Sequence, residues 1–331
     1  MSERSDVLHL VVPLGIDDPS RPSGGNIYDR RLSDELRAHG HQVVEHHVSP
    51  PEVGPVLAEL PDLAHVLVDG LLVSDAADAL IHEARRVRLG VLIHMLTGDE
   101  RERDVLSAAA CVITTSAWGR NQVIADLGLA PSRVHVATPG TDPAPLATGT
   151  AEGSALLCVA AVAEHKGHDV LLRALAMLTD LSWRLVIVGS LEREPAFVAL
   201  LRQQAEEDGT TSRITFTGAL SGIALDRAYA DADVLVHPSR GEMYGLVIAE
   251  ALSRGLPVIA SGAGAVPEAM GDRAAGMLVP PADPHALAAA LREWLSSSAC
   301  RSALRSAALS RRPTLPSWAA TVEAVVAAMR G

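Results

Sequence analysis

Short apolar runs alternate with stretches of helical periodicity along most of the chain. Residues 7–14 (VLHLVVPL) have the length and continuous apolar character of a buried parallel strand. A helix is predicted next, because Ile27, Leu32 and Leu36 fall on one face before Gly40. Four further runs in this half have the character of strands: QVVEHHV, AHVLVDG, LGVLIHM and ACVITTS.

The second half of the chain repeats this alternation. Strand-like runs such as ALLCVAAV, WRLVIVGS, DVLVHPS and LPVIAS separate the predicted helices. Strands that alternate with helices predict parallel sheets covered by helices on both faces. We therefore expect an α/β protein with two Rossmann-like, doubly wound parallel-sheet domains that face a cleft. The helices predicted in this half cover 168–180, 194–207, 222–230 and 284–296, with another from about residue 245.

Two segments are predicted to connect or complete the domains. Residues 139–154 (PGTDPAPLATGTAEGS) are rich in Pro, Gly, Thr and Ala, as in a linker. Near the C-terminus, two prolines precede a final amphipathic helix that carries Trp318, Val322 and Val325. From the residues alone, this helix either caps the second domain or crosses back to the first.

Composition narrows the possible partners. The 331 residues suit about two domains, and with 48% hydrophobic but only 3% aromatic residues the cores must be aliphatic. A net charge of −12 without a dense Lys/Arg stripe argues against nucleic acid or an anionic membrane as a partner. The chain shows neither a signal peptide nor an apolar run long enough to span a membrane. We expect a cytoplasmic globular protein, with a homodimer as a possibility, and no disulfide or zinc framework from three scattered cysteines.

Ligands of open α/β sheets bind beyond the carboxyl ends of the strands, so the loops there carry the candidate residues. Gly24 and Gly25 precede a helix and let a backbone approach an anion, although plain turn chemistry explains them as well. His94 ends a strand near the expected ligand edge, where a lone histidine is more often structural. Lys166, beside Gly167 at a helix start, suits a phosphate group, and a solvated lysine is the alternative.

The stretch GEMYGLVIAE (241–250) holds two glutamates eight positions apart. Eight residues of continuous helix rotate by about 80°, so Glu242 and Glu250 would not share one face. If Glu242 lies in the loop and Glu250 in the second helical turn, both can border one site, with the N–H groups of Gly245 and Leu246 directed at an anion. Glu250 lies among apolar residues and needs a partner, either a ligand hydroxyl or a basic side chain.

These motifs together resemble the retaining family 4 glycosyltransferases of GT-B fold. The likeness includes the E-x7-E stretch EMYGLVIAE followed by ALSRGLPVIASGAGAVPE, and VAAVAEHKGHDVLLRAL, which is similar to the family's donor-phosphate loop. It extends to GGNIYDRRLSDELRAHGHQV, VITTSAWGRNQVIADLGLAPSRVHVATPGTD and PADPHALAAALREWL, in the family's order. The resemblance implies an acceptor-binding domain over 1–145, a nucleotide-sugar-binding domain over 146–311 and a C-terminal helix, 312–331, that crosses back to the first domain.

The resemblance also implies roles for individual residues. Glu250 would hold the donor ribose and Glu242 the sugar hydroxyls, while Lys166 would grip the diphosphate with backbone groups of the loop. Glu242, His94 and Lys166 are the expected catalytic residues, with His94 beside the donor sugar. The expected donor-binding residues are Gly24, Gly25, Lys166, Ser190, Met243, Tyr244, Gly245, Leu246 and Glu250.

The chain departs from the family pattern at two positions. Where the family has an arginine five residues before the lysine, this chain has Ala161. Either another cation replaces it, with Arg240 and Arg120 as candidates, or the leaving group is stabilised less strongly. Where the family has an acidic residue and a glycine after VIVG, this chain has Ser190, which changes the expected contacts with the base.

The implied activity is a retaining, metal-independent glycosyl transfer from a nucleoside-diphosphate sugar to a small-molecule or lipid acceptor, without a cofactor. The acidic pair in DAD (231–233) is discounted as a metal site because it precedes or begins a strand. Two alternatives stay open: a sugar-nucleotide epimerase of the same architecture, and a catalytically silent sugar-nucleotide-binding subunit. A glycoside hydrolase is disfavoured, because it leaves the phosphate-type loops unexplained.

Overall fold

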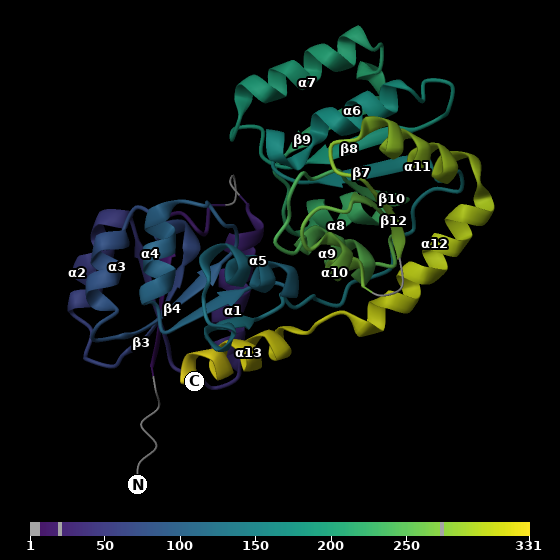
Figure 1. Ribbon diagram of the computed structural model, residues 1–331. Helices are drawn as coiled ribbons and strands as arrows, with labels where there is room; N and C mark the ends of the chain where they lie inside the picture. The colour runs from purple at the N-terminus through teal and green to yellow at the C-terminus, as the bar shows by residue number, and fades with distance from the viewer. Residues whose placement is uncertain (1–6, 19–21, 272–274) are drawn as a thin grey trace. The chain divides into compact units, whose positions relative to one another are not determined.

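A computed structural model describes residues 7–18, 22–271 and 275–331, and it divides into two compact units. Unit 1 combines the N-terminal segment up to Asp18 with Gly24–Gly140 and Pro316–Gly331, and unit 2 consists mainly of Thr141–Leu315. Each unit is a sheet with helices around it (Figure 1).

Unit 1 contains a six-stranded sheet with the order β2-β1-β3-β4-β5-β6, in which all described neighbours pair in parallel. The strands β1, β3, β4 and β5 are largely buried, as their continuous apolar runs predict. The strands are β1 Leu8–Pro13, β2 Val43–Val48, β3 His65–Asp69, β4 Arg88–Ile93, β5 Cys111–Thr114 and β6 Val134–Val136. The helices are α1 Gly24–Ala38, α2 Val53–Ala58, α3 Ala77–Glu83, α4 Glu100–Ala108, α5 Ala117–Leu127 and α13 Trp318–Arg330.

The last helix, α13, is part of the core of unit 1. Its Trp318, Val322 and Val325 belong to the same buried cluster as Tyr28 and the strand residues of this unit. Figure 1 shows α13 beside α1, and the rings of Trp318 and Tyr28 meet edge to face at 5.7 Å. Gly140 permits this approach, because a Cβ there would collide with the backbone of Trp318. The tail therefore completes a core that begins about 300 residues earlier in the chain.

Unit 2 holds the second six-stranded sheet, β12-β11-β10-β7-β8-β9, again parallel between the described neighbours. Aliphatic clusters cover its two faces, with Trp183 and Trp294 among the largest fully buried side chains. The strands are β7 Ala155–Val159, β8 Arg184–Val188, β9 Ile214–Gly218, β10 Val234–His237, β11 Val258–Ser261 and β12 Gly276–Val279. The helices are α6 His168–Ala176, α7 Pro195–Glu207, α8 Gly222–Ala230, α9 Leu246–Ser253, α10 Val266–Met270, α11 Pro284–Ser296 and α12 Ser298–Arg311.

The predicted fold class, α/β with two parallel sheets, is confirmed. Helices α8 and α11 have the predicted bounds, whereas α6 ends at Ala176 because its last turn tightens, with Met177 and Leu178 donating to carbonyls three residues back. The units divide after Gly140 and after Leu315, where the sequence placed boundaries at 145 and 311. Among the helices of the described residues, none is both long and apolar enough for a membrane span.

Candidate functional site

The loop between β10 and α9 carries the first glutamate of GEMYGLVIAE. Glu242 lies in this loop, and Glu250 lies in the second turn of α9, as predicted. Gly245 precedes the helix with φ 95°, a left-handed conformation that favours glycine. The loop is tied to the next one by the hydrogen bond from Ala265 N to the Glu242 carbonyl oxygen, at 2.9 Å. The free N–H groups in the first turn of α9 therefore follow a loop, containing Glu242, whose backbone is held in place.

Glu242 and Lys166 form an ion pair. Lys166 Nζ lies 2.6 Å from Glu242 Oε1, and His237 Nε2 lies 2.9 Å from the same oxygen. Burial opposes ionisation of Glu242, but Lys166 and His237 outweigh it and hold the pKa of this carboxyl well below its ordinary value. Glu242 is therefore a carboxylate at neutral pH, with its charge balanced by a cation brought from another loop.

Lys166 comes from the loop between β7 and α6. It ends a short 3-10 turn, Glu164–Lys166, and Gly167 then adopts φ 73° before α6 begins. A Cβ at Gly167 would collide with the carbonyl oxygen of Pro238, so the loops after β7 and β10 touch at this point. Lys166 is also the only lysine in the sequence. Every other residue counted as Lys or Arg is an arginine. That signal was readable in the sequence and was missed.

Glu250 has a partner within unit 2 that the sequence did not suggest. The Tyr229 hydroxyl donates to Glu250 Oε2 at 2.7 Å, in place of the basic side chain considered above. Burial raises the pKa of Glu250 above its ordinary value, and the Tyr229 hydrogen bond offsets this only in part. Arg254 stacks on the Tyr229 ring at 4.4 Å and contributes positive charge nearby.

The other predicted donor-binding positions in unit 2 are largely buried. The side chains of Met243 and Tyr244 point into the protein, so a ligand would meet their backbone, as it would at Gly245 and Leu246. Ser190 follows β8 and is buried, and its hydroxyl accepts from Glu192 N at 3.4 Å. No described contact links Ser190 to the Lys166–Glu242 pair.

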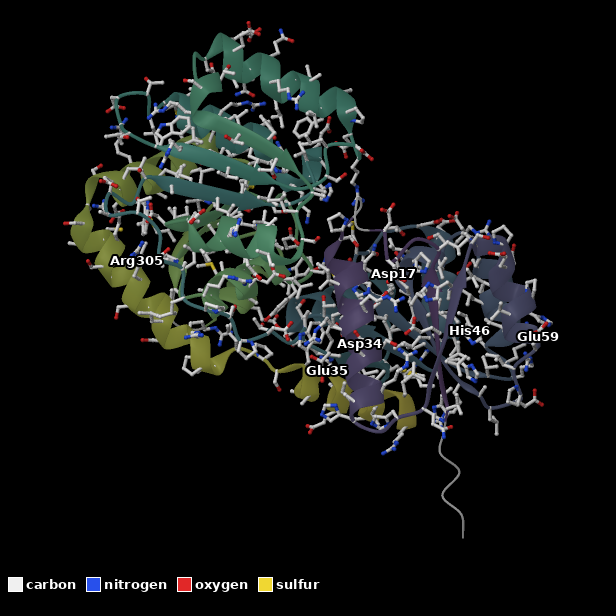
Figure 2. All side chains as sticks on the ribbon, turned by 180° about the vertical axis from the view of Figure 1, so that it is seen from behind. Asp17, Asp34, Glu35, His46, Glu59 and Arg305 are labelled. Atoms are coloured by element: carbon white, nitrogen blue, oxygen red, sulfur yellow. The ribbon has the colours of Figure 1, made fainter. Side chains whose placement is uncertain are left out.

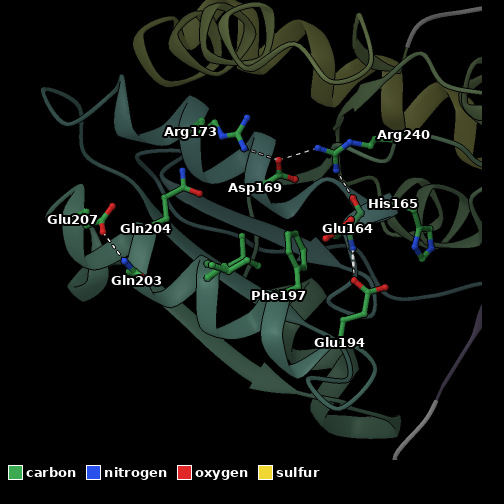
Figure 3. Close-up of a pocket in the computed structure, with 12 residues that line it drawn as sticks. Glu164, His165, Asp169, Arg173, Glu194, Phe197, Gln203, Gln204, Glu207 and Arg240 are labelled. Atoms are coloured by element: carbon green, nitrogen blue, oxygen red, sulfur yellow. Dashed lines mark hydrogen bonds and ion pairs between the residues drawn. The ribbon is translucent and has the colours of Figure 1, made fainter.

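The two candidate replacements for the absent arginine at Ala161 differ in their surroundings. Arg240 lies in the same loop as Glu242, and its Nη2 is 2.8 Å from Asp169 Oδ2 (Figure 3). Arg120 belongs to unit 1 and donates to the carbonyl oxygens of Val134 and Pro131. Arg240 is thus next to the Lys166 loop, whereas Arg120 ties down the backbone of its own unit.

A groove of about 850 Å³ lies along α6 and α7 (Figure 3). Asp169, held between Arg173 and Arg240, forms one part of its wall, and Phe197 forms another. Lys166 and Glu242 are not among the described residues that line it. The groove therefore adjoins the loop that carries Lys166, but it is not the site of the ion pair.

The candidate residues of unit 1 meet at the carboxyl edge of its sheet. Helix α1 begins at Gly24, and a Cβ on Gly25 would lie 3.1 Å from His94 Cδ2, which is too close without a shift of the ring. His94 Nε2 lies 2.8 Å from Asp29 Oδ1, and Asp69 is close by. Neither aspartate was predicted as a site residue, although Asp69 ends a strand at the edge where ligands bind.

Comparison with known proteins supports a relationship to sugar-transferring enzymes. Residues 153–297 match the family model of Glycosyl transferases group 1. A D-inositol 3-phosphate glycosyltransferase of Catenulispora acidiphila is 30% identical over 250 residues, which cover 69% of this chain and 59% of that protein. One from Mycolicibacterium vanbaalenii is 32% identical over 247 residues, covering 68% of this chain and 54% of that protein. The chain thus spans only a little over half the length of these relatives.

Solved structures show the same fold over nearly the full chain. HepE of Anabaena, in complex with UDP and glucose, superposes with a TM-score of 0.78 at 19% identity, covering 98% of this chain and 99% of that one. Sucrose-phosphate synthase from Thermosynechococcus elongatus superposes with a TM-score of 0.80 at 22% identity, covering 98% of both chains. At these identities the likeness is one of fold.

Proposed function

We propose that the chain, as a member of the group 1 glycosyl transferases, whose family model matches residues 153–297, transfers a sugar from a nucleoside-diphosphate sugar to an acceptor hydroxyl. The GT-B fold agrees with this proposal. The observation that carries this proposal is the ion pair of Lys166 and Glu242 at the start of α9. Lys166 comes from the loop after β7, and Glu242 comes from the loop after β10, which leads into the N-terminus of α9. A cation, an ionised carboxylate and a helix N-terminus are thereby placed at the carboxyl edge of one sheet. These are the groups that a sugar diphosphate requires.

The proposed reaction breaks the bond between the sugar carbon C1 and the diphosphate oxygen, and it forms a bond from C1 to the acceptor oxygen. Negative charge develops on the leaving phosphate, where Lys166 and the first N–H groups of α9 would stabilise it. Glu242 would hold sugar hydroxyls, and Glu250 the donor ribose. The acceptor proton would pass to the leaving phosphate on the same face of the sugar, so the configuration at C1 would be retained.

The proposal assigns the leaving-group charge to protein groups and not to a divalent ion. Asp233, the residue of the DAD segment nearest to the strand, is fully buried and accepts from Thr150 and Ala155. Its carboxylate is thereby committed to the protein backbone and to Thr150, which leaves it no open position for a metal-bound diphosphate.

Unit 1 offers an apolar surface for the acceptor. Five large apolar side chains lie near the carboxyl ends of the adjacent strands β1, β3, β4 and β5, either just after a strand or in the first turn of the helix that follows it. Each is 38% to 59% exposed: Leu14, Ile27, Leu71, Met95 and Trp118. Apolar side chains left exposed at the ligand edge of a sheet favour a partner with an apolar face. We therefore propose an acceptor that joins a hydroxyl to an apolar body, in place of the inositol phosphate in the names of the relatives.

A donor screen followed by turnover tests the function. Nucleoside-diphosphate sugars of uridine, guanosine, adenosine and thymidine are added to the protein, and the one that binds raises the melting temperature. Transfer is then measured to aryl and alkyl alcohols and to inositol phosphate. Absence of donor binding across the screen would refute the proposal, and a preference for inositol phosphate would refute the apolar acceptor.

The same assay separates the two alternatives. An epimerase converts the donor without any acceptor, so a second nucleotide sugar appears in a reaction that contains only donor. A silent subunit, which the alanine at position 161 makes plausible, binds donor with Glu242 intact and transfers to no acceptor. A homodimer and a cytoplasmic location also stay predictions, which size-exclusion chromatography and cell fractionation test.

Replacing Glu250 with alanine is expected to raise the KM for the donor by roughly tenfold to a hundredfold, with a smaller effect on kcat. The proposed contact is a charge-assisted hydrogen bond to a ribose hydroxyl, which contributes about 1.5–3 kcal/mol. Steady-state kinetics with varied donor measures the effect. Tyr229→Phe is the matched control, because it removes the protein partner of Glu250 and keeps the carboxylate. An unchanged donor KM in Glu250→Ala would contradict the ribose role.

Ala161→Arg is expected to tighten binding of the nucleoside diphosphate by roughly tenfold, the effect of one added charge-assisted hydrogen bond. Ala161 is partly exposed and is the second residue after β7, in the loop that carries Lys166. Isothermal titration with the diphosphate measures the affinity. Ala161→Leu adds bulk without charge and serves as the control. Equal affinities of the two variants would show that position 161 does not face the diphosphate.

A further inference from the structure

Three side chains from separate elements of unit 1 form a buried cluster at the carboxyl edge of its sheet. Asp29 comes from α1, Asp69 is the last residue of β3, and His94 follows β4. One polar atom of each lies within 4.8 Å of the others. Asp29 is 4% and Asp69 2% exposed, and the His94 side chain is 10% exposed. Only the histidine therefore reaches the surface.

The bonds within this cluster leave one oxygen on each aspartate. His94 Nε2 binds Asp29 Oδ1 at 2.8 Å, and Asp69 Oδ1 accepts from Leu71 N at 2.7 Å. The two Oδ2 atoms are buried, and neither has a partner among the described residues. Two buried carboxylate oxygens without donors are costly, and a single proton held between the two carboxyl groups satisfies both.

The buried, charged surroundings of the cluster also determine which of its side chains carry a proton. Burial, and after it the nearby charge of Asp29, raises the pKa of Asp69 to about 8. Burial alone would lower the pKa of His94, but the charge of Asp29 and its hydrogen bond are the main causes that raise this pKa to about 9. At neutral pH His94 is therefore protonated on both nitrogens, and Asp69 is a carboxylic acid.

The imidazole is also fixed by packing. Tyr28 meets it edge to face with ring centroids 5.2 Å apart, and the Tyr28 hydroxyl is anchored by donating to the Ala137 carbonyl oxygen at 2.9 Å. Gly25 lies against another part of the ring. Among the described residues packed against His94, the titratable ones are Tyr28 and Asp29 on α1 and Asp69 on β3. The ring has little freedom to turn.

We propose that Asp29 and Asp69 are positioning residues for His94. Asp29 accepts from Nε2–H, Asp69 donates its carboxyl proton to Asp29, and Nδ1–H is thereby presented as a fixed, charged donor to a substrate hydroxyl. The arrangement of the ring stands on the geometry alone. Its use on a substrate rests on the proposed function.

Asparagine substitutions distinguish this arrangement from a merely structural one. In Asp69→Asn, the amide oxygen accepts from Leu71 N and the amide N–H₂ donates to Asp29, as the carboxylic acid does. Asp69→Asn is therefore expected to keep kcat within about threefold. Asp29→Asn removes the charge that holds His94 and is expected to lower kcat at least tenfold. If Asp69 acts as an ionised carboxylate, the two variants will lose activity equally, which overturns the proposal.

Histidine-selective 15N NMR of the full chain provides the readout that does not depend on activity. His94 is expected to stay protonated on both nitrogens at pH 7.5 in the wild type and in Asp69→Asn, and to become neutral there in Asp29→Asn. A neutral His94 in the folded wild type overturns the proposal. A shift of the His94 signals on adding Mg²⁺ or Mn²⁺ also overturns it, because the cluster would then be a cation site.

The failures of the two proposals are separable. If the NMR pattern holds and no nucleotide sugar binds, the proposed function fails and the positioning of His94 stands. If a donor binds and turns over but Asp29→Asn retains full kcat, the function stands and the positioning role fails. Circular dichroism melting of each variant confirms that it is folded before either conclusion is drawn.

Discussion

Lys166→Met is expected to lower kcat for sugar transfer roughly 10²–10³-fold, the effect of removing one preorganised group that stabilises transition-state charge. Nζ of Lys166 lies 2.6 Å from Glu242, in the loop that leads into α9, where the diphosphate is proposed to bind. Methionine keeps the length of the side chain and removes its charge. Single-turnover kinetics with saturating donor measures the loss in the chemical step.

Two further variants show whether charge alone matters. Lys166→Arg keeps the charge but replaces a compact ammonium with a planar fork, so an intermediate loss is expected. Lys166→Met/Glu242→Gln removes both members of the pair and tests whether an unbalanced buried carboxylate causes the effect. Undiminished kcat in Lys166→Met would exclude a role for the lysine at the leaving group.

The single lysine makes a direct measurement possible. Reductive methylation with 13C-formaldehyde labels Lys166 and the α-amino group, which differ in chemical shift. Addition of a nucleoside diphosphate is expected to shift the Lys166 signal as its partner changes from Glu242 to phosphate. A signal that stays fixed while the melting temperature rises would place the bound diphosphate away from Lys166.

Asp233→Ala is expected to lower the free energy of unfolding by about 1–3 kcal/mol, the cost of leaving a buried donor without its partner. Asp233 is fully buried and accepts from Thr150 N at 2.7 Å, Thr150 Oγ1 at 2.6 Å and Ala155 N at 2.9 Å. Arg305 of α12, labelled in Figure 2, adds an ion pair at 3.0 Å. The Asp233 carboxylate thus connects the segment that leads into β7 with the helix α12.

Asp231→Ala is the matched control, since Asp231 is exposed two positions earlier. Its removal is expected to change the free energy of unfolding by less than about 0.5 kcal/mol. Urea denaturation followed by fluorescence of the buried tryptophans measures both variants. Equal stabilities of the two variants would mean that water replaces the Asp233 network at no cost.

Local patterns predicted the secondary structure and the loops that carry the site. Alternation of apolar runs with helical periodicity was sufficient for two parallel sheets, because buried parallel strands leave a continuous apolar signal. The loop position of Glu242 and the helical position of Glu250 followed from the glycine between them. These features depend on neighbours within about ten residues.

Partners distant in sequence were not predictable in the same way. The contact of Lys166 with Glu242 spans 76 positions, and that of His94 with Asp29 spans 65. The choice of a tyrosine hydroxyl as partner for Glu250 depends on how α8 packs beside α9, which no local pattern encodes. Tertiary packing decides which polar side chains meet, and the residues themselves show only that partners are needed.

The place of α13 in unit 1 has a consequence for biosynthesis. A ribosome makes the chain from its N-terminus, so Thr141–Leu315 is synthesised in full before Trp318 and the rest of α13. Unit 2 can therefore fold while the apolar face of α1 around Tyr28 is not yet packed against α13. A nascent chain that stops before α13 carries a finished second unit and an open apolar seam on the first. Closure of the N-terminal core therefore waits until α13 has been synthesised.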